Sequence, residues 1–168
     1  FVISADTTLD ARGQNVILQS SSGNNRIFSV SPGAALTLRG LTLTSQTTFE
    51  VPGAAIYNSG TLRIEGVTIR DSYAADGGGG AIYNAGTMSI HDSTLDHNTT
   101  TQAGGAIANT GQADIVNTTI SNNNCDFGGG GIFNGGTLRL VNSTLSGNYC
   151  DWNGGALYNV GTADVTNT

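Results

Sequence analysis

The stretch Gly79-Gly-Ala-Ile-Tyr-Asn84 decides the fold, because close variants of it recur along the chain at a nearly constant interval. Each variant closes on an asparagine, and these residues are Asn58, Asn84, Asn109, Asn134 and Asn159. They are spaced by 26, 25, 25 and 25 residues. A fixed period of this length is typical of solenoids, in which each repeat forms one coil and neighbouring coils bury a shared core.

Between these stretches the repeat contains short runs in which apolar and polar residues alternate. A Gly follows each closing Asn by two positions, and the next run holds apolar pairs such as Leu62 with Ile64 and Met88 with Ile90. Alternation with period two between Gly or Asn turns predicts strands. The longer Gly-free stretches are rich in Thr, Ser, Asn and Asp, which are mediocre helix formers, so helices are not favoured.

The sequence therefore predicts an all-β fold, a single-stranded parallel β-helix of about six to seven rungs with about 25 residues each. We interpret 1–168 as one domain, in which 1–52 form less regular rungs and 53–168 form regular ones, the last rung being incomplete. A shift of 26 residues matches early positions to later ones, namely Leu36 with Leu62, Leu38 with Ile64, Leu43 with Ile69 and Val30 with Ile56.

The closing asparagines share the parity of the inward apolar residues, so they are expected to point into the coil. An inward amide can hydrogen-bond to the equivalent amide on the rungs above and below, which satisfies every buried polar atom except at the ends of the stack. We therefore interpret the closing asparagines as a structural ladder and not as a functional site. A second asparagine ladder is predicted from Asn98, Asn123 and Asn148.

The two cysteines, Cys125 and Cys150, lie one period apart and so occupy the same position of adjacent rungs. Stacked Cα atoms lie about 4.8 Å apart, within the window of about 4.4–6.8 Å that disulfides require. We predict a disulfide between them and hence an oxidising compartment. The alternative is a pair of free thiols; two cysteines alone do not complete a structural zinc site.

Two acidic residues, Asp126 and Asp151, are stacked beside the cysteines, and like charges at this spacing repel. A bound Ca²⁺ would relieve the repulsion, whereas a solvated turn needs no ion. We favour the solvated turn and expect no cofactor. The next residues, Phe127 and Trp152, also share a position and are expected to stack.

Outward positions carry most of the information about contacts. One column places Arg139 between Asp114 and Asp164, which predicts a solvent-exposed ion-pair ladder of modest value. A second column is aromatic, is interrupted by Ala108, and contains Tyr57, Tyr83, Phe133 and Tyr158. An exposed stripe of this kind can mark a contact surface, bind sugars or lie beneath a neighbouring copy, and the residues do not decide among these.

Composition excludes several classes of protein. The 168 residues include 25 Gly and 2 Pro, and the net charge is −6 from twelve acidic residues and six basic ones, all of them Arg. A nucleic-acid binder needs clustered positive charge, so that class is excluded, as is any chemistry that requires Lys. The chain contains no run of about 20 mostly apolar residues, so we expect no membrane insertion by a helix.

Four segments resemble the GGAI motif of polymorphic outer membrane protein repeats: Gly79-Gly-Ala-Ile82, Gly104-Gly-Ala-Ile107, Gly130-Gly-Ile132 and Gly154-Gly-Ala-Leu157. The partner motif of that family, Phe-x-x-Asn, appears with an aliphatic residue in place of Phe, as Leu95-x-x-Asn98, Ile120-x-x-Asn123 and Leu145-x-x-Asn148. The N-terminal third is similar only in general style to pectin-lyase-like proteins. The resemblance implies a right-handed β-helix, secreted or displayed on a prokaryotic cell surface, often as an adhesin-type passenger.

An enzyme is the alternative, because pectin-lyase-like folds include polysaccharide lyases and glycoside hydrolases. Asp114 and Asp164 would stand two rungs apart, about 9.6 Å, within the range of a hydrolytic carboxylate pair. Motifs expected of polygalacturonases and pectate lyases are not seen, and no Gly-x-Ser-x-Gly elbow exists. We interpret His91 and His97 as surface residues.

Ice binding would need paired Thr columns, and the column of Thr61, Thr87, Thr137 and Thr162 is broken by Gln112. The sequence thus favours a non-enzymatic extracellular module that is structural or adhesin-like, with a glycan or a cell-surface molecule as its ligand. The chain starts on the apolar run Phe1-Val2-Ile3 and stops inside a rung. We hypothesise that copies stack end to end into a filament; the alternative is a piece of a longer passenger.

Overall fold

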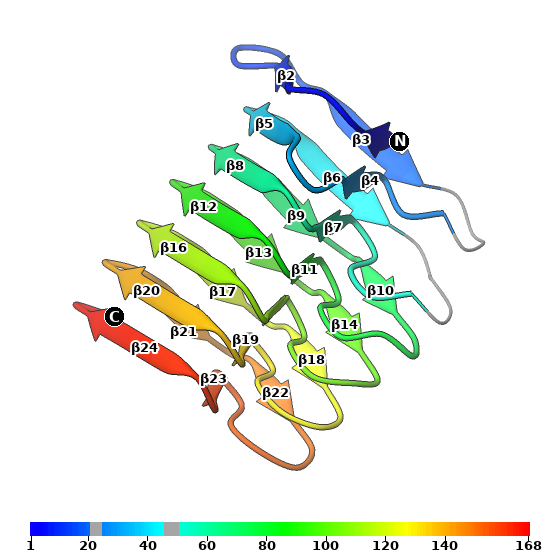
Figure 1. The fold of residues 1–168 in the computed structure, drawn as a ribbon. Helices are drawn as coiled ribbons and strands as arrows, with labels where there is room; N and C mark the ends of the chain where they lie inside the picture. The colour runs from blue at the N-terminus through cyan, green and yellow to red at the C-terminus, as the bar shows by residue number, and fades with distance from the viewer. Residues whose placement is uncertain (21–24, 46–50) are drawn as a thin grey trace.

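The chain winds through 24 short strands in the residues that the structure, a computed structural model, describes, which are 1–20, 25–45 and 51–168. All strand pairings are parallel and join each strand to its equivalent one repeat away. The described residues contain no helix, and therefore none long and apolar enough to cross a membrane. Figure 1 shows the resulting stack of rungs, with the two termini at opposite ends.

Each rung visits up to four sheets, called A to D here in chain order. Sheet A contains β1 (Val2–Ile3), β4 (Phe28–Val30), β7 (Ile56–Asn58), β11 (Ile82–Asn84), β15 (Ile107–Asn109), β19 (Ile132–Asn134) and β23 (Leu157–Asn159). Sheet B contains β2 (Thr7–Asp10), β5 (Ala35–Arg39), β8 (Thr61–Glu65), β12 (Thr87–His91), β16 (Gln112–Val116), β20 (Thr137–Val141) and β24 (Thr162–Thr166).

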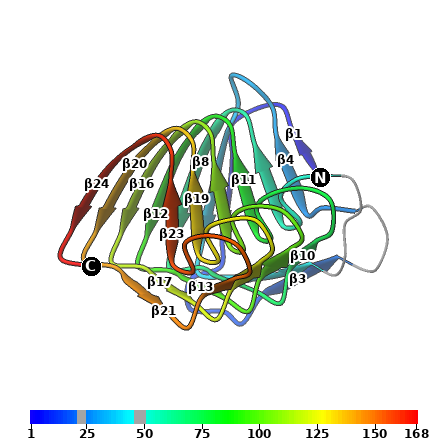
Figure 2. The same cartoon turned by 90° about the horizontal axis from the view of Figure 1, so that it is seen from below.

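The other two sheets complete each rung. Sheet C contains β3 (Ile17–Ser20), β6 (Thr42–Ser45), β9 (Thr68–Arg70), β13 (Thr94–Asp96), β17 (Thr119–Ser121) and β21 (Thr144–Ser146). Sheet D contains β10 (Tyr73–Ala74), β14 (Thr99–Thr100), β18 (Asn124–Cys125) and β22 (Tyr149–Cys150). Figure 2 shows the same stack from below, with successive rungs following one another from the C-terminus to the N-terminus. The predicted parallel β-helix is confirmed.

The interior is lined by the apolar residues of the alternating runs. Leu62 and Ile64 of β8 point inward, and their partners on both sides, in β5 and β12, are apolar as well. The largest fully buried side chains are Phe28, Leu36, Leu38, Leu43, Ile56, Leu62, Ile64, Ile69, Ile82, Met88, Ile90 and Leu95. A single rung has no partner for this face, so burial arises only when rungs stack.

The match of Val30 with Ile56 is wrong. The structure pairs Phe28 with Ile56 and Val30 with Asn58. The connection between β4 and β5 contains four residues, 31–34, whereas the equivalent connection after β7 contains two, so the constant shift fails there. The other three matches, of Leu36, Leu38 and Leu43, are confirmed by the strand register. An apolar side chain, Val30, thus occupies the ladder position below Asn58.

The first asparagine ladder is confirmed. Each side-chain Nδ2 donates to the Oδ1 of the next asparagine along the chain, at 2.7, 2.7, 2.7 and 2.6 Å from Asn58 to Asn159. The same Nδ2 atoms donate to backbone carbonyls of the following rung, for example Asn109 to Thr137 at 3.0 Å. Among the described residues, no buried side-chain nitrogen or oxygen lacks a partner.

The second ladder is also present, in the turn between sheets C and D. Asn98 Nδ2 donates to Asn123 Oδ1 at 3.0 Å, and Asn123 Nδ2 donates to Asn148 Oδ1 at 2.9 Å. Each amide also donates to a backbone carbonyl one rung back, as Asn123 does to Leu95 at 3.0 Å. In the preceding rung the position belongs to Ser72, whose backbone N–H donates to Asn98 Oδ1 at 3.1 Å.

Glycines follow the first ladder because the backbones of successive rungs meet there. A Cβ added to Gly111 would lie 2.1 Å from the carbonyl oxygen of Gly86, and a Cβ on Gly136 would lie equally close to that of Gly111. No side chain can be placed at that distance, so these rungs need Gly at this position. In the rung before Gly60 the position belongs to Ala34. The glycines that follow the ladder are therefore a consequence of stacking.

We predict that Asn109→Ala, in the middle of the first ladder, destabilises the fold by about 3 kcal/mol, because it leaves buried donors and acceptors on both neighbouring rungs unpaired. The matched change Asn159→Ala, at the exposed end, is expected to cost about 1 kcal/mol or less. Denaturant unfolding followed by circular dichroism measures both, and equal losses would contradict a cooperative ladder.

Candidate functional site

The aromatic stripe, defined as Tyr57, Tyr83, Phe133 and Tyr158, runs along the outer face of sheet A. Each residue is the middle one of its strand, where the flanking Ile or Leu and Asn side chains point inward, so the ring points outward. The strand register aligns all four, with Ala108 between Tyr83 and Phe133. The predicted stripe is therefore one column in the structure, interrupted at Ala108.

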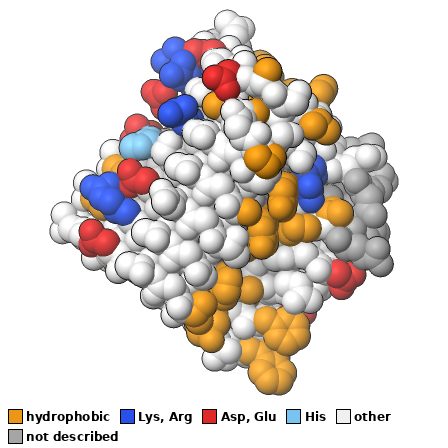
Figure 3. All heavy atoms as spheres, viewed as in Figure 1, with side chains coloured by type: hydrophobic (Ala, Val, Ile, Leu, Met, Phe, Trp, Pro, Cys, Tyr) orange, Lys and Arg blue, Asp and Glu red, His pale blue; other side chains and the backbone are white. Residues whose placement is uncertain are grey.

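The stripe consists of two ring pairs. The rings of Tyr57 and Tyr83 stack with centroids 5.5 Å apart and planes 7° apart, whereas those of Phe133 and Tyr158 lie 6.0 Å apart at 44°. Ala108, only 2% exposed, separates the pairs. Figure 3 shows hydrophobic side chains in a band across this side of the molecule, while many of the charged groups lie along one edge.

All four residues of the stripe are partly buried. A Cβ added to Gly128 would lie 2.6 Å from Cδ1 of Tyr158, so the absence of a side chain at Gly128 leaves room for the ring. The glycine-rich connections between sheets D and A thus leave space for an outward ring to pack against the backbone. Rings held in this way lose little conformational freedom when a partner binds.

Arg26 extends the stripe at its N-terminal end, and sequence reasoning missed it. Its guanidinium carbon lies 4.9 Å from the centroid of the Tyr57 ring, a cation–π contact. The guanidinium also donates to the carbonyl oxygens of Pro52, at 2.5 Å, and Gly53, at 3.3 Å. Burial lowers the pKa of Arg26, an effect that Tyr57 partly offsets. The residue belongs to the less regular rungs, where no repeat pattern signals its position.

A second exposed pair lies in the connections that follow β18 and β22. Phe127 and Trp152 stack with centroids 6.0 Å apart, as predicted, and are 50% and 73% exposed. Next to them, Cys125 and Cys150 are register partners whose Sγ atoms lie 2.8 Å apart. Both are free thiols in the structure. The predicted juxtaposition is present, and the disulfide itself stays a prediction.

The charged column of sheet B has the predicted register, Asp114 with Arg139 and Arg139 with Asp164. Arg139 contacts Asp114 at 2.8 Å, and both side chains are about half exposed. A shallow hollow of about 180 Å³ beside this pair is lined by Thr87, Met88, Gln112, Ala113 and Thr137 as well. Solvent-exposed pairs of this type contribute about 0–1 kcal/mol.

No group of three or more His, Cys, Asp or Glu side chains that could hold a metal ion occurs among the described residues. Asp126 and Asp151 follow the two cysteines without a third ligand of these types beside them in that part of the chain. The solvated turn stays the prediction here, and bound calcium stays its alternative.

Sequence reasoning also missed an unbroken column of threonines on sheet C. It consists of Thr42, Thr68, Thr94, Thr119 and Thr144. The parallel column two residues further along reads Thr44, Arg70, Asp96, Ser121 and Ser146, so paired threonine columns do not form. The period-two pattern holds this signal, which becomes visible once the sheet C runs are aligned separately.

The two histidines lie apart, His91 at the end of β12 and His97 in the turn that follows β13. His91 lines a shallow polar hollow of about 400 Å³ with Arg39, Arg63 and Glu65. His97 is exposed, and its Nδ1 lies 2.6 Å from Asp96 Oδ2. Sequence reasoning placed both on the surface; His91 is half-buried and His97 is exposed.

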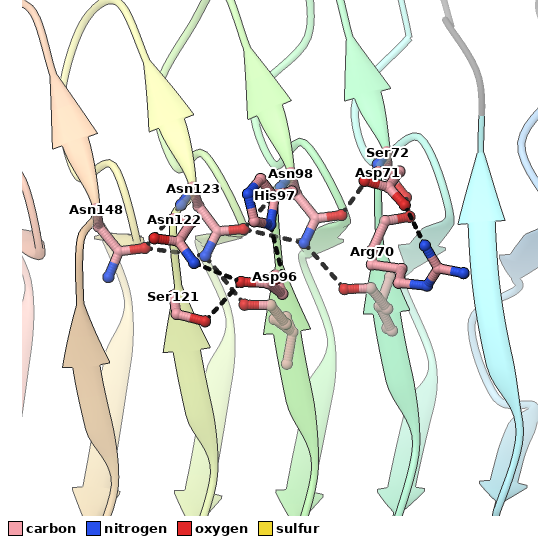
Figure 4. A network of polar contacts seen from close by, with 12 residues as sticks. Arg70, Asp71, Ser72, Asp96, His97, Asn98, Ser121, Asn122, Asn123 and Asn148 are labelled. Atoms are coloured by element: carbon pink, nitrogen blue, oxygen red, sulfur yellow. Dashed lines mark hydrogen bonds and ion pairs between the residues drawn. The ribbon is translucent and has the colours of Figure 1, made fainter.

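Asp96 is the centre of a polar network at the turn between sheets C and D (Figure 4). Ser121 Oγ and Asn122 Nδ2 donate to its Oδ1 at 2.6 and 2.9 Å, and His97 approaches Oδ2. Burial raises the pKa of Asp96, but the hydrogen bonds from Ser121, His97 and Asn122 together lower it below the ordinary 3.8. The network joins two rungs and holds a carboxylate.

We predict that Asp96→Asn destabilises the chain by about 1–2 kcal/mol, because the charge-assisted bonds from the next rung are lost. The matched change Asp114→Asn removes an exposed ion pair and is expected to cost about 0.5 kcal/mol or less. Because the folded pKa of Asp96 is lowered, its contribution is complete above 3.8 and is lost as the pH falls toward the folded pKa. Unfolding of both variants across acidic pH measures this, and identical acid profiles would contradict it.

The parallel register, the inward asparagine ladders and the stacked rungs agree with a match to a known protein family. The family described as right-handed β-helix region matches residues 9–168. The chain belongs to the right-handed β-helix family. No curated protein and no solved structure matches this β-helix. The family membership establishes the fold of the β-helix, and the repeat type of the polymorphic outer membrane proteins stays a resemblance.

Proposed function

We propose that this β-helix is a non-enzymatic, extracellular module, structural or adhesin-like, whose contact surface is the aromatic stripe. The observation that carries the proposal is the aligned column of outward rings on sheet A, in which Tyr57 stacks on Tyr83 and a tilted ring pair follows further along the axis. Aromatic rings bury a large apolar area for few rotatable bonds, which suits them to contact surfaces. The partner we propose is a glycan or another cell-surface molecule that lies along the axis of the solenoid.

The location outside the cell or at its surface is part of the same proposal. It is supported by the stacked thiol pair, Cys125 and Cys150, whose geometry would allow a disulfide. Disulfides form and persist in oxidising compartments such as the cell exterior.

We predict that the double change Tyr57→Ala and Tyr83→Ala weakens binding to an array of neutral polysaccharides at least about tenfold, because truncated aromatic anchors typically cost more than 1 kcal/mol. The matched control is Thr68→Ala with Thr94→Ala, two outward changes on sheet C. Equal binding by the tyrosine variant and the parent would overturn the stripe as the contact surface.

The enzymatic alternative has one observation in its favour, the hollow beside Asp114 and Arg139. Incubation with polyuronides and neutral polysaccharides, followed by reducing-sugar and unsaturated-product assays, tests it. Activity that disappears in Asp114→Asn or Asp164→Asn would replace the adhesin-like proposal. Binding of a polysaccharide without turnover supports the adhesin-like proposal.

Self-association is the second part of the proposal. At the N-terminal face, Phe1 is 78% exposed and Val2 is 76% exposed. Both residues line an apolar hollow of about 350 Å³, together with Leu9, Leu18 and Phe28. We propose that in a second copy β1 and β2 add to β23 and β24, since those strands have the matching sheet types.

We predict that the 168-residue chain forms longer assemblies as its concentration rises, as measured by analytical ultracentrifugation and electron microscopy. The change Val2→Asp is expected to abolish this assembly. Val2 is exposed, so this change leaves the fold intact. A chain that stays monomeric at every concentration would overturn end-to-end stacking while leaving the stripe proposal untouched.

A further inference from the structure

We propose that Cys125 and Cys150 are an oxidation site, at which a small disulfide oxidant enters through Cys150 and joins two successive rungs covalently. The pair lies in sheet D, at the ends of β18 and β22. The proposal concerns the chemistry of these thiols and is independent of what binds to the aromatic stripe.

The geometry meets the requirements of a disulfide without backbone movement. Cys125 and Cys150 are direct register partners in a parallel pair of strands, so their Cα atoms are one strand spacing apart, about 4.8 Å. This lies within the window of about 4.4–6.8 Å for bridged cysteines. The two Sγ atoms already approach to 2.8 Å. The neighbouring ring pair, Phe127 with Trp152, indicates that the connections that follow both strands run in register as well.

The two thiols differ in their surroundings, and the difference sets the order of reaction. Cys125 is fully buried, and burial together with the contact from Cys150 raises its pKa to about 12. Cys150 is half-buried and is therefore the more accessible of the two residues. Since the thiolate is the attacking species and access limits the encounter, an oxidant in solution reacts first at Cys150.

The reaction balances with oxidised glutathione as the oxidant. The Cys150 thiol loses its proton to solvent, and its thiolate attacks one sulfur of the oxidant, whose S–S bond breaks and releases one glutathione thiolate. Cys125 then loses its proton and attacks Cys150 Sγ, which expels the second glutathione thiolate. Both released thiolates take up protons. The protein has lost two hydrogens, and the two electrons reside in two glutathione thiols.

The product would tie β18 to β22, two neighbouring strands of sheet D. The strands beyond the bridge, β23 and β24, are mostly exposed, and β21 and β22 are only partly buried. Separation of β22 from β18 would have to stop at the covalent link. The stacked Trp152 lies beside the bridge, so its fluorescence reports the change.

The test is incubation of the reduced chain with oxidised glutathione in mildly alkaline buffer, followed by intact mass and thiol counting. We expect both thiols to disappear, a mass lower by two hydrogens, and a rise in melting temperature of about 10 °C that a reductant reverses. A chain that keeps both thiols, or that forms only intermolecular dimers, would overturn the proposal.

Two matched variants test the order of reaction. Cys125→Ser should stop at a glutathione adduct on Cys150, whereas Cys150→Ser should stay unmodified because Cys125 is buried. Neither variant should gain thermal stability from the oxidant. Modification of Cys150→Ser as fast as Cys125→Ser would overturn entry through Cys150. Circular dichroism of the reduced variants checks their fold, and the thiol count of the parent chain decides the main claim if a variant fails to fold.

Discussion

Parallel register at one strand spacing is the constraint on which the rest of this structure depends. Because each strand pairs with its own equivalent, every side chain meets a copy of its own position on the next rung. Stacked charges of one sign would repel, stacked apolar groups fuse into a core, and stacked amides satisfy each other. The low content of charged residues, the apolar interior and the two asparagine ladders are three results of that one rule.

Repetition is also what made much of the fold predictable from sequence. The closing asparagines, the alternating pairs such as Leu62 with Ile64, and the cysteine pair share the period, so their neighbours follow from arithmetic alone. The same arithmetic placed the aromatic stripe on one face. Val30 was misplaced because two additional residues in one connection break the constant shift, and such an insertion leaves no mark in a period count.

Other features depend on conformation or on side-chain direction. The turns between sheets B and C and between C and D place Asp92, Asn117, Asn142 and His97 at positive φ, a region that Asn, Asp and Gly tolerate best. A composition rich in Asn suggests ladders, and it does not separate these left-handed residues from the ladder residues beside them. The contact of Arg26 with Tyr57 and the convergence of Ser121 and Asn122 on Asp96 depend on rotamers, which a sequence period does not contain.

The first asparagine ladder has a direction. From Asn58 onward each amide donates to the residue that comes later in the chain, and no rung reverses this sense. Because the direction never reverses, the two ends of the ladder differ chemically. Asn58 has a side-chain oxygen that accepts from no other asparagine, and Asn159 has a side-chain nitrogen that donates to no other asparagine in the described chain. The solenoid is thus polar along its axis at the level of single hydrogen bonds.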